Sequence, residues 1–383
     1  MLKNTAWLAL TLSLAVTGLG HLRAQQTPAG PTRYPQLPQP YFRALEDTSK
    51  FGLKPDEIKA GERPDYQRIR DPLELIPVQG AIHLVGGGGG NVAVQLGDDG
   101  VLLVNTGVES VADRMIAAYK SLSPRQLRWI VNTSADLKYT GGNEKVAASG
   151  IAGPPGGGGG GGAGAGGFQG GGASVISHEN VLNRMSAPTG QTASRPVAAW
   201  PTDTFFTPKK SFWYNDEPIE FFYQPSAHSD GDILVFFRKS DVVVAGEILA
   251  TDHFPMWDPS RGGSYQGMLD GLNKIIDIAV PQYNQQGGTR VVPGSGRICN
   301  ETDVVEYRDM ATIIRDRIAA MVKKGLTLEQ VKAAHPALDY DGQYGSSTGP
   351  WTTDMYINAL YQEQVKLNAP PAPPKGRVPA QKK

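Results

Sequence analysis

The 383-residue sequence predicts an α/β domain with a large hydrophobic core. Short apolar segments with strand character alternate with stretches of helical periodicity, and this alternation occurs in two similar halves of the chain. The length suffices for one large domain or two small ones. The continuous apolar run at residues 101–104 is typical of a strand that is buried on both faces, as in the middle of a covered sheet.

The expected elements follow from periodicity and from turn residues. Expected strands in the first half are residues 81–85, 91–96, 101–104 and 127–131. Expected helices there are residues 108–122 and a segment from 141 to 149, and residues 173–180 read as a strand that enters a helix. Expected strands in the second half are residues 205–206, 211–214, 219–223, 233–238, 242–245 and 290–292. Expected helices there are residues 263–279, 303–323, 327–334 and 350–367.

The first 24 residues are typical of a secretory signal peptide. A short, positively charged start precedes an apolar run at residues 5–20, and Ala24 offers a small residue before the expected cleavage point. The run is short for a membrane span, so we expect no span after cleavage, although retention as an anchor stays open. The sequence therefore predicts an exported protein, in the periplasm or outside the cell.

Composition divides the mature chain into three further segments and a folded domain. Residues 25–80 are expected to form a Pro-rich linker and a loosely packed arm, and residues 81–367 the domain itself. Residues 153–172 are almost entirely glycine, which predicts a disordered insertion because ordering such a segment costs too much entropy. Residues 368–383 are expected to be a disordered basic tail.

Charge and cysteine content exclude several classes of protein. The chain has 37 basic and 37 acidic residues, so nothing favours a nucleic-acid partner. Cys299 is the only cysteine, and therefore no intramolecular disulfide can form. The sequence leaves the oligomeric state open.

A loop that follows the apolar segment at residues 127–131 carries the most informative motif. Residues 133–143 read Thr-Ser-Ala-Asp-Leu-Lys-Tyr-Thr-Gly-Gly-Asn. This loop resembles the metal-binding loop of the metallo-β-lactamase superfamily, whose pattern is Thr-His-x-His-x-Asp-His-x-Gly-Gly-Asn. The resemblance implies a four-layer α/β/β/α sandwich. The residues at the four ligand positions are Ser134, Asp136, Lys138 and Tyr139.

Further motifs extend the resemblance over residues 82–364. Ala-His-Ser-Asp-Gly-Asp at residues 227–232 is similar to a family motif and puts His228 at a ligand position. Glu247 stands at the position of the bridging carboxylate, one methylene longer than the usual Asp, and Ser295 stands where a last histidine is expected. The resemblance assigns bracing roles around the ligands to Asn105, Asp232 and Asn143.

The resemblance implies a metal site that has lost most of its ligands. Ser134, Lys138, Tyr139 and Ser295 occupy lost-ligand positions, and only six histidines are present in the whole chain. The remaining set is Asp136, His228 and Glu247, which predicts either no metal or one weakly bound divalent ion such as Zn, Mn or Fe.

Lys138 suggests a specific replacement for the missing ion. A cleft that keeps Asp136 and Glu247 without a metal carries buried charge that needs compensation. We therefore expect the ammonium of Lys138 to pair with Asp136, Glu247 or both, and the alternative is that Lys138 points to solvent.

Two functions are compatible with these residues. The first is a non-catalytic or metal-poor relative that binds a small ligand. The second is a metal-dependent hydrolase of ester, thioester or amide bonds with an altered, at most mononuclear site, in which Tyr139 and Lys138 are the catalytic candidates beside the ion. Both functions imply a small-molecule partner.

Overall fold

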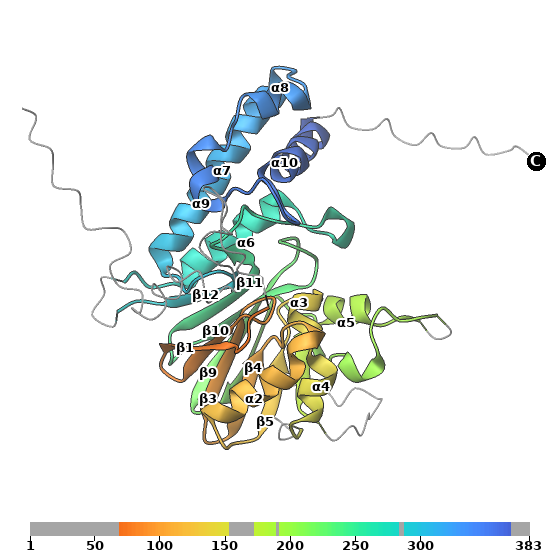
Figure 1. Ribbon diagram of the computed structural model, residues 1–383, viewed down its shortest axis with the longest axis vertical. Helices are drawn as coiled ribbons and strands as arrows, with labels where there is room; N and C mark the ends of the chain where they lie inside the picture. Colours follow the sequence, from red (N-terminus) through yellow and green to blue (C-terminus); the bar gives the residue numbers. More distant parts are fainter. Residues whose placement is uncertain (1–68, 153–171, 189–190, 283–286, 369–383) are drawn as a thin grey trace, which may run out of the picture. The chain divides into compact units, whose positions relative to one another are not determined.

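A computed structural model of the chain describes residues 69–152, 172–188, 191–282 and 287–368 (Figure 1). Contacts divide the chain after residue 37, and residues 1–37 lie wholly outside the described part. The expected signal peptide, most of the arm, nearly all of the glycine-rich insertion and all but the first residue of the tail also lie outside it. In the ranges that the structure describes, no helix combines the length and the apolar character that crossing a membrane requires.

Twelve strands of the described residues form two sheets. The first sheet has the order β1-β2-β3-β4-β5-β6-β7, and the second has the order β12-β11-β10-β9-β8. The strands of the first sheet are Glu74–Gln79, Ile82–Gly86, Val92–Gly97, Gly100–Val104, Leu127–Val131, Ser174–His178 and Asp203–Phe205. Those of the second, from β8 to β12, are Lys209–Tyr214, Glu217–Gln224, Asp232–Phe237, Val242–Ala250 and Arg290–Ser295.

Strand direction changes within each sheet. The pairs from β1 to β4 are antiparallel, whereas β4, β5, β6 and β7 run parallel to one another. In the second sheet the pairs from β8 to β11 are antiparallel and only β11 and β12 are parallel. The two sheets pack face to face, and Trp129 on β5 meets Phe212 on β8 with ring centroids 5.6 Å apart.

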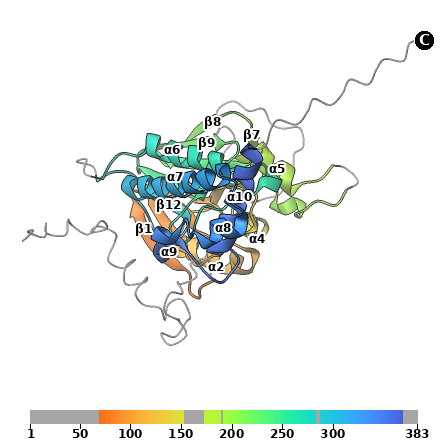
Figure 2. The ribbon, with the colours of Figure 1, turned by 90° about the horizontal axis from the view of Figure 1, so that it is seen from above.

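Helices cover the outer face of each sheet (Figures 1 and 2). On the first sheet lie α2 and α4, which bury Met115, Tyr119 and Val146 against the strands. On the second sheet lies α6, and α7 and α10 pack behind it. The expected four-layer α/β/β/α sandwich is therefore confirmed.

The helices, from α2 to α10, are Ala112–Leu122, Leu137–Thr140, Asn143–Ala148, Glu179–Met185, Tyr265–Ile278, Glu301–Lys323, Leu328–Ala333, Leu338–Tyr344 and Thr353–Asn368.

Local sequence explains where the long helices begin. At the start of α7, the side chain of Asn300 accepts from the backbone N–H of Asp303, whose carboxylate accepts from Asn300 N–H in return. Ser264 caps α6 by accepting from the N–H of Gly267. Each helix therefore begins two residues from the start that periodicity predicts, α7 at residue 301 instead of 303 and α6 at residue 265 instead of 263.

Several features differ from the sequence-based expectation, among them the short helix α3 in the loop after β5, which was expected to be irregular. β1 belongs to the first sheet, so the ordered domain begins before residue 81, in the segment that was assigned to the arm. β11 continues to Ala250 instead of ending at residue 245, and it therefore contains Glu247. The short helix α9 was not expected, because Leu338 to Tyr344 contains two aspartates and a glycine.

Candidate functional site

The candidate site lies where the loops after β5, β11 and β12 meet the loop before β10. The short helix α3 follows β5 and carries Lys138 and Tyr139. His228 lies in the turn that leads into β10, and Glu247 lies inside β11. Gly246, at φ +54°, has no Cβ, and a Cβ there would lie 2.8 Å from Thr133 Oγ1. This close approach holds β11 against the loop after β5 and brings the two sets of residues together.

Glu247 is the centre of the first ion pair. Its side chain is 0% exposed, and its Oε2 lies 2.5 Å from Lys138 Nζ. Tyr139 Oη donates to the same oxygen at 2.6 Å. Burial alone would raise the pKa of Glu247, but the ammonium of Lys138 and the nearby charges of His228 and His253 lower it to about 2. Glu247 is therefore ionised and Lys138 is its counterion.

Asp136 is the centre of the second cluster. Its Oδ2 lies 2.9 Å from His228 Nε2, and its Oδ1 accepts a hydrogen bond from the guanidinium of Arg261. Burial would raise the pKa of Asp136, but the hydrogen bond and charge of His228, together with Arg261, hold it well below its usual range. Arg261 also donates through Nε to Asp258 Oδ2 at 2.7 Å, which fixes the plane of the guanidinium.

The contacts of His228 favour a protonated imidazolium, in which neither ring nitrogen has a free lone pair. Its Nδ1 lies 2.8 Å from the carbonyl oxygen of Met256, so this nitrogen carries a proton. Burial would lower the pKa of His228, but the hydrogen bond to Asp136 and the charge of that carboxylate raise it to about 9. At neutral pH both ring nitrogens therefore donate, Nε2 to Asp136 and Nδ1 to Met256.

The residues expected to brace the site occupy buried positions beside it. Asp232 Oδ2 accepts from the backbone N–H of Ser229 at 2.5 Å and so shapes the turn that presents His228. Burial raises the pKa of Asp232 to about 7, against the charge of His228 and the N–H of Ser229. Asn105 Oδ1 accepts from both the N–H and the hydroxyl of Thr133, at 2.9 and 3.1 Å. Asp232 and Asn105 thus hold the two loops on which His228 and Asp136 lie.

Asn143 and the two serines complete the expected set. Asn143 Oδ1 accepts from Thr106 Oγ1 at 2.9 Å and from Asn132 at 3.1 Å, which ties α4 to the loops after β4 and β5. Ser134 is buried, and its Oγ accepts from the backbone N–H of Asp136 at 3.3 Å. Ser295 donates to Asp252 Oδ2 at 2.5 Å and shows no contact with either ion pair.

The donor atoms do not fit a metal ion in this arrangement. A divalent ion needs the carboxylate oxygens and an imidazole lone pair free to converge on one point. Here Glu247 Oε2 holds an ammonium and a phenol, while Asp136 holds His228 and Arg261. Across the described ranges, no three His, Cys, Asp or Glu side chains come together as a potential metal site. The set Asp136, His228 and Glu247 is thus divided between two ion-pair clusters.

Sequence reasoning anticipated one of the two counterions. Pairing of Lys138 with Glu247 is one of the expected alternatives, and the structure contains it; the alternative that Lys138 points to solvent is wrong, because its side chain is only 15% exposed. Arg261 was missed, since it lies in a loop far from the ligand motif. Charge balance offered a signal: two buried carboxylates, Asp136 and Glu247, call for more than one cation.

Comparison with known protein families agrees with the two-sheet architecture. The model of the metallo-β-lactamase superfamily matches residues 85–281, more than half of the chain. The chain belongs to the metallo-β-lactamase superfamily. No curated protein matches the sequence.

Solved structures also match the chain, including two of low sequence identity. The stereoselective inverting sec-alkylsulfatase from Pseudomonas sp. superposes with a TM-score of 0.52 and 15% identity, over 79% of this chain and 52% of that one. A metallo-β-lactamase from Pontibacter korlensis gives a TM-score of 0.44 and 13% identity, over 63% and 99% of the two chains. The 383-residue chain thus spans about half the length of the alkylsulfatase. At 15% identity, its likeness to that enzyme concerns the fold alone.

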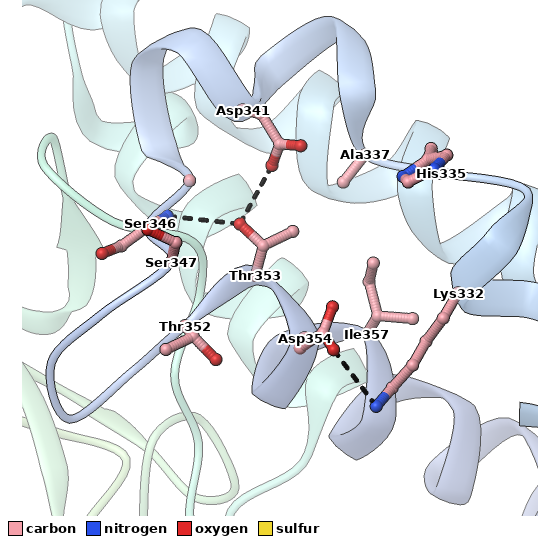
Figure 3. Close-up of a pocket in the computed structure, with 11 residues that line it drawn as sticks. Lys332, His335, Ala337, Asp341, Ser346, Ser347, Thr352, Thr353, Asp354 and Ile357 are labelled. Atoms are coloured by element: carbon pink, nitrogen blue, oxygen red, sulfur yellow. Dashed lines mark hydrogen bonds and ion pairs between the residues drawn. The ribbon is translucent and has the colours of Figure 1, made fainter. Parts of the chain in front are cut away.

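A cavity of about 670 Å³ lies apart from the two ion pairs (Figure 3). It is formed by α8, α9, the start of α10 and the loops between them, and its lining is mostly polar. Lys332 pairs with Asp354 at 3.3 Å, and Thr353 donates to Asp341 at 3.0 Å, as the dashed lines in Figure 3 show. Lys332 and Asp354 thus neutralise each other within it, and none of the residues that line it belongs to the superfamily motifs.

Proposed function

We propose that this protein is a non-catalytic, metal-poor member of the metallo-β-lactamase superfamily that is exported and binds a small ligand. The observation that carries the proposal is the engagement of the remaining metal donors. Glu247 is bonded to Lys138 and Tyr139, and Asp136 is bonded to His228 and Arg261. A metal would have to displace a cation of the chain from each carboxylate that it used.

The protein's own residues offer little for catalysis at this site. Tyr139 is completely buried, donates to Glu247, and has a pKa that burial and the charge of Glu247 raise well above its usual value. Ser134 is buried as well and has no imidazole beside it in the contacts of the described residues. Tyr139 and Ser134 therefore make structural hydrogen bonds here, and neither is activated as a nucleophile by a neighbouring base in the described part of the chain.

The edge of the site is the part that a ligand can reach. Leu137 is 55% exposed and lies between Asp136 and Lys138 in the sequence, and the side chain of Arg261 is 27% exposed. An apolar side chain flanked by fixed charges supports a small molecule with both apolar and polar groups as the ligand.

The first test is the metal content of the mature protein. We expect far less than one ion per chain by plasma mass spectrometry, after purification without chelator and re-exposure to Zn, Mn and Fe. Hydrolysis of ester and thioester substrates should then stay at the background rate.

The alternative function is a hydrolase of ester, thioester or amide bonds with a mononuclear site. It would be supported by one ion per chain that is lost in the His228→Ala variant, because His228 is the one imidazole kept from the motif. That result would replace the proposed function.

A further inference from the structure

We infer that Lys138 and Arg261 are built-in replacements for metal cations, each neutralising one of two separated clusters of buried donors. The inference rests on the proposed function, since it requires that the native protein holds no ion at these carboxylates. It goes further by assigning the two side chains that keep the ion out and by predicting what their removal creates.

The first cluster needs a cation because Glu247 has no contact with solvent. Its side chain is 0% exposed, and among the described residues the one charged group bonded to it is the ammonium of Lys138, at 2.5 Å. Tyr139 contributes a neutral hydrogen bond to the same oxygen. The second oxygen, Oε1, has no hydrogen-bond partner among the described residues. Without Lys138 the carboxylate would be buried with one phenol as its partner, which is strongly unfavourable.

The second cluster is compensated from another part of the chain. Arg261 is the last residue of a single 3-10 turn, Pro259–Arg261, and Asp258 caps the start of this turn. Its guanidinium donates to Asp136 and Asp258, and a third nitrogen lies 3.2 Å from His228 Nε2. Asp136 thus has the guanidinium of Arg261 at Oδ1 and the imidazole of His228 at Oδ2.

The two cations also occupy the space that an ion would need. Lys138 Nζ is at contact distance from Glu247, and the guanidinium covers the side of Asp136 that His228 leaves open. Removal of both cations should leave two buried carboxylates that have each lost a counterion, with the imidazole of His228 still beside Asp136. These are ligands for a divalent ion, so the doubly neutral variant should gain the metal affinity that the native chain lacks.

The experiment compares Lys138→Met, Arg261→Met and the double variant with the native chain. Lys145→Met is the matched control, because Lys145 also pairs with a carboxylate, Asp113, but at the surface, with side chains 60% and 77% exposed. Thermal unfolding is measured with chelator and with Zn or Mn, and metal content is measured by plasma mass spectrometry. Purified full-length mature protein is used throughout.

The inference predicts a distinct pattern. Lys138→Met should lower the Tm by roughly 5 °C or more, since it leaves a buried charge unpaired, whereas Lys145→Met should change it by about 1 °C or less. Zn or Mn should raise the Tm of the double variant and leave the native Tm unchanged. A Lys138→Met variant as stable as Lys145→Met, or a folded double variant that takes up no ion, would overturn the inference while leaving the proposed function intact.

A second set of variants keeps the test decisive if the double variant does not fold. Glu247→Gln combined with Lys138→Met removes both charges of the first cluster at once. The combined variant should unfold at a higher temperature than Lys138→Met alone, because the unpaired carboxylate is gone. A combined variant that unfolds at the same temperature as Lys138→Met alone, or at a lower one, would show that Lys138 does not compensate Glu247. Stoichiometric metal in the native chain would instead remove the proposed function itself.

Discussion

His228 is the residue whose chemistry the surroundings change most clearly. In the family motif it stands at a metal-ligand position, where a neutral imidazole is required. Here its Nδ1 faces the carbonyl oxygen of Met256, and its Nε2 faces the carboxylate of Asp136 and a guanidinium nitrogen of Arg261. Neither ring nitrogen therefore has a lone pair that is free to bind a metal. The same side chain therefore serves as a charged link between β10 and the loop after β5.

Because the pKa of His228 is raised on folding, part of the free energy of unfolding is lost at alkaline pH. A group whose pKa rises from about 6.5 to about 9 on folding stabilises the protein fully below pH 6.5, and this share is lost as the pH rises through 9. We expect the native chain to lose on the order of 2–3 kcal/mol between pH 6.5 and pH 10 that a His228→Gln variant does not lose. Urea unfolding of the native chain and of the His228→Gln variant at a series of pH values measures this difference. Parallel pH profiles of the two proteins would contradict the prediction.

At the scale of elements, close backbone approaches set the position of the ion pairs. β12 passes directly over the ring hydroxyl of Tyr139, and a Cβ on Gly294 would collide with Tyr139 Oη and with the carbonyl of Gly246. β11 is brought against Thr133 in the same way by Gly246. The strands β11 and β12 thus define how far α3 can lie from Glu247.

A single methyl group on β12 should therefore disturb the first ion pair. We expect Gly294→Ala to destabilise the protein by about 2–4 kcal/mol, because Tyr139 must move away from Glu247 and the strands must separate. Gly342→Ala is the control, since Gly342 lies in α9 with nothing near its added Cβ, and it should be neutral or slightly stabilising. Chemical denaturation compares the two variants. Equal stability of both would show that β12 does not hold Tyr139 in place.

At the scale of the whole domain, the site exists only where the two sheets meet. The loops of the first sheet supply Asp136 and Lys138, and the second sheet with its loops supplies His228, Glu247 and Arg261. The sheets are also joined by a buried contact between Gln95 Nε2 on β3 and Glu217 Oε1 on β9, at 2.7 Å.

Glu217 should be one of the most sensitive positions outside the candidate site. Its carboxylate is 1% exposed and accepts from Gln95, from the N–H and hydroxyl of Ser240, and from the N–H of Lys239. Glu217→Gln turns one acceptor into a donor that faces two N–H groups, so we expect a loss of about 2–4 kcal/mol.

The neighbouring exposed acid provides a matched control for that change. Asp216 pairs with Lys239 at the surface and has a φ of +60°, which asparagine tolerates. Asp216→Asn should change the free energy of unfolding by less than about 0.5 kcal/mol. Urea unfolding of the two variants tests whether the buried contact between the sheets matters. Similar values for both would argue against it.

Local pattern in the sequence determined the strands, the helices and the family. The apolar run at β5 followed by Thr-Gly-Gly-Asn carried the resemblance to the superfamily, and the four-layer sandwich was implied by that resemblance, whereas periodicity predicted only an α/β domain. β1 escaped this reasoning, since its strand character comes from pairing with β2 rather than from its own composition. The residues that stand at the family's ligand positions, Ser134, Lys138 and Tyr139, could also be read from the sequence alone.

Only the tertiary structure decided how the retained groups are used. It paired Lys138 with Glu247, and it brought Arg261 from 125 positions along the chain to Asp136. The physical reason is that compensation of a buried charge depends on which cation lies nearest in space, and sequence spacing carries no record of that distance. The sequence thus determined which residues stand at the ligand positions of the family motif, and the packing of two sheets decided that cations of the chain itself face the carboxylates of Asp136 and Glu247.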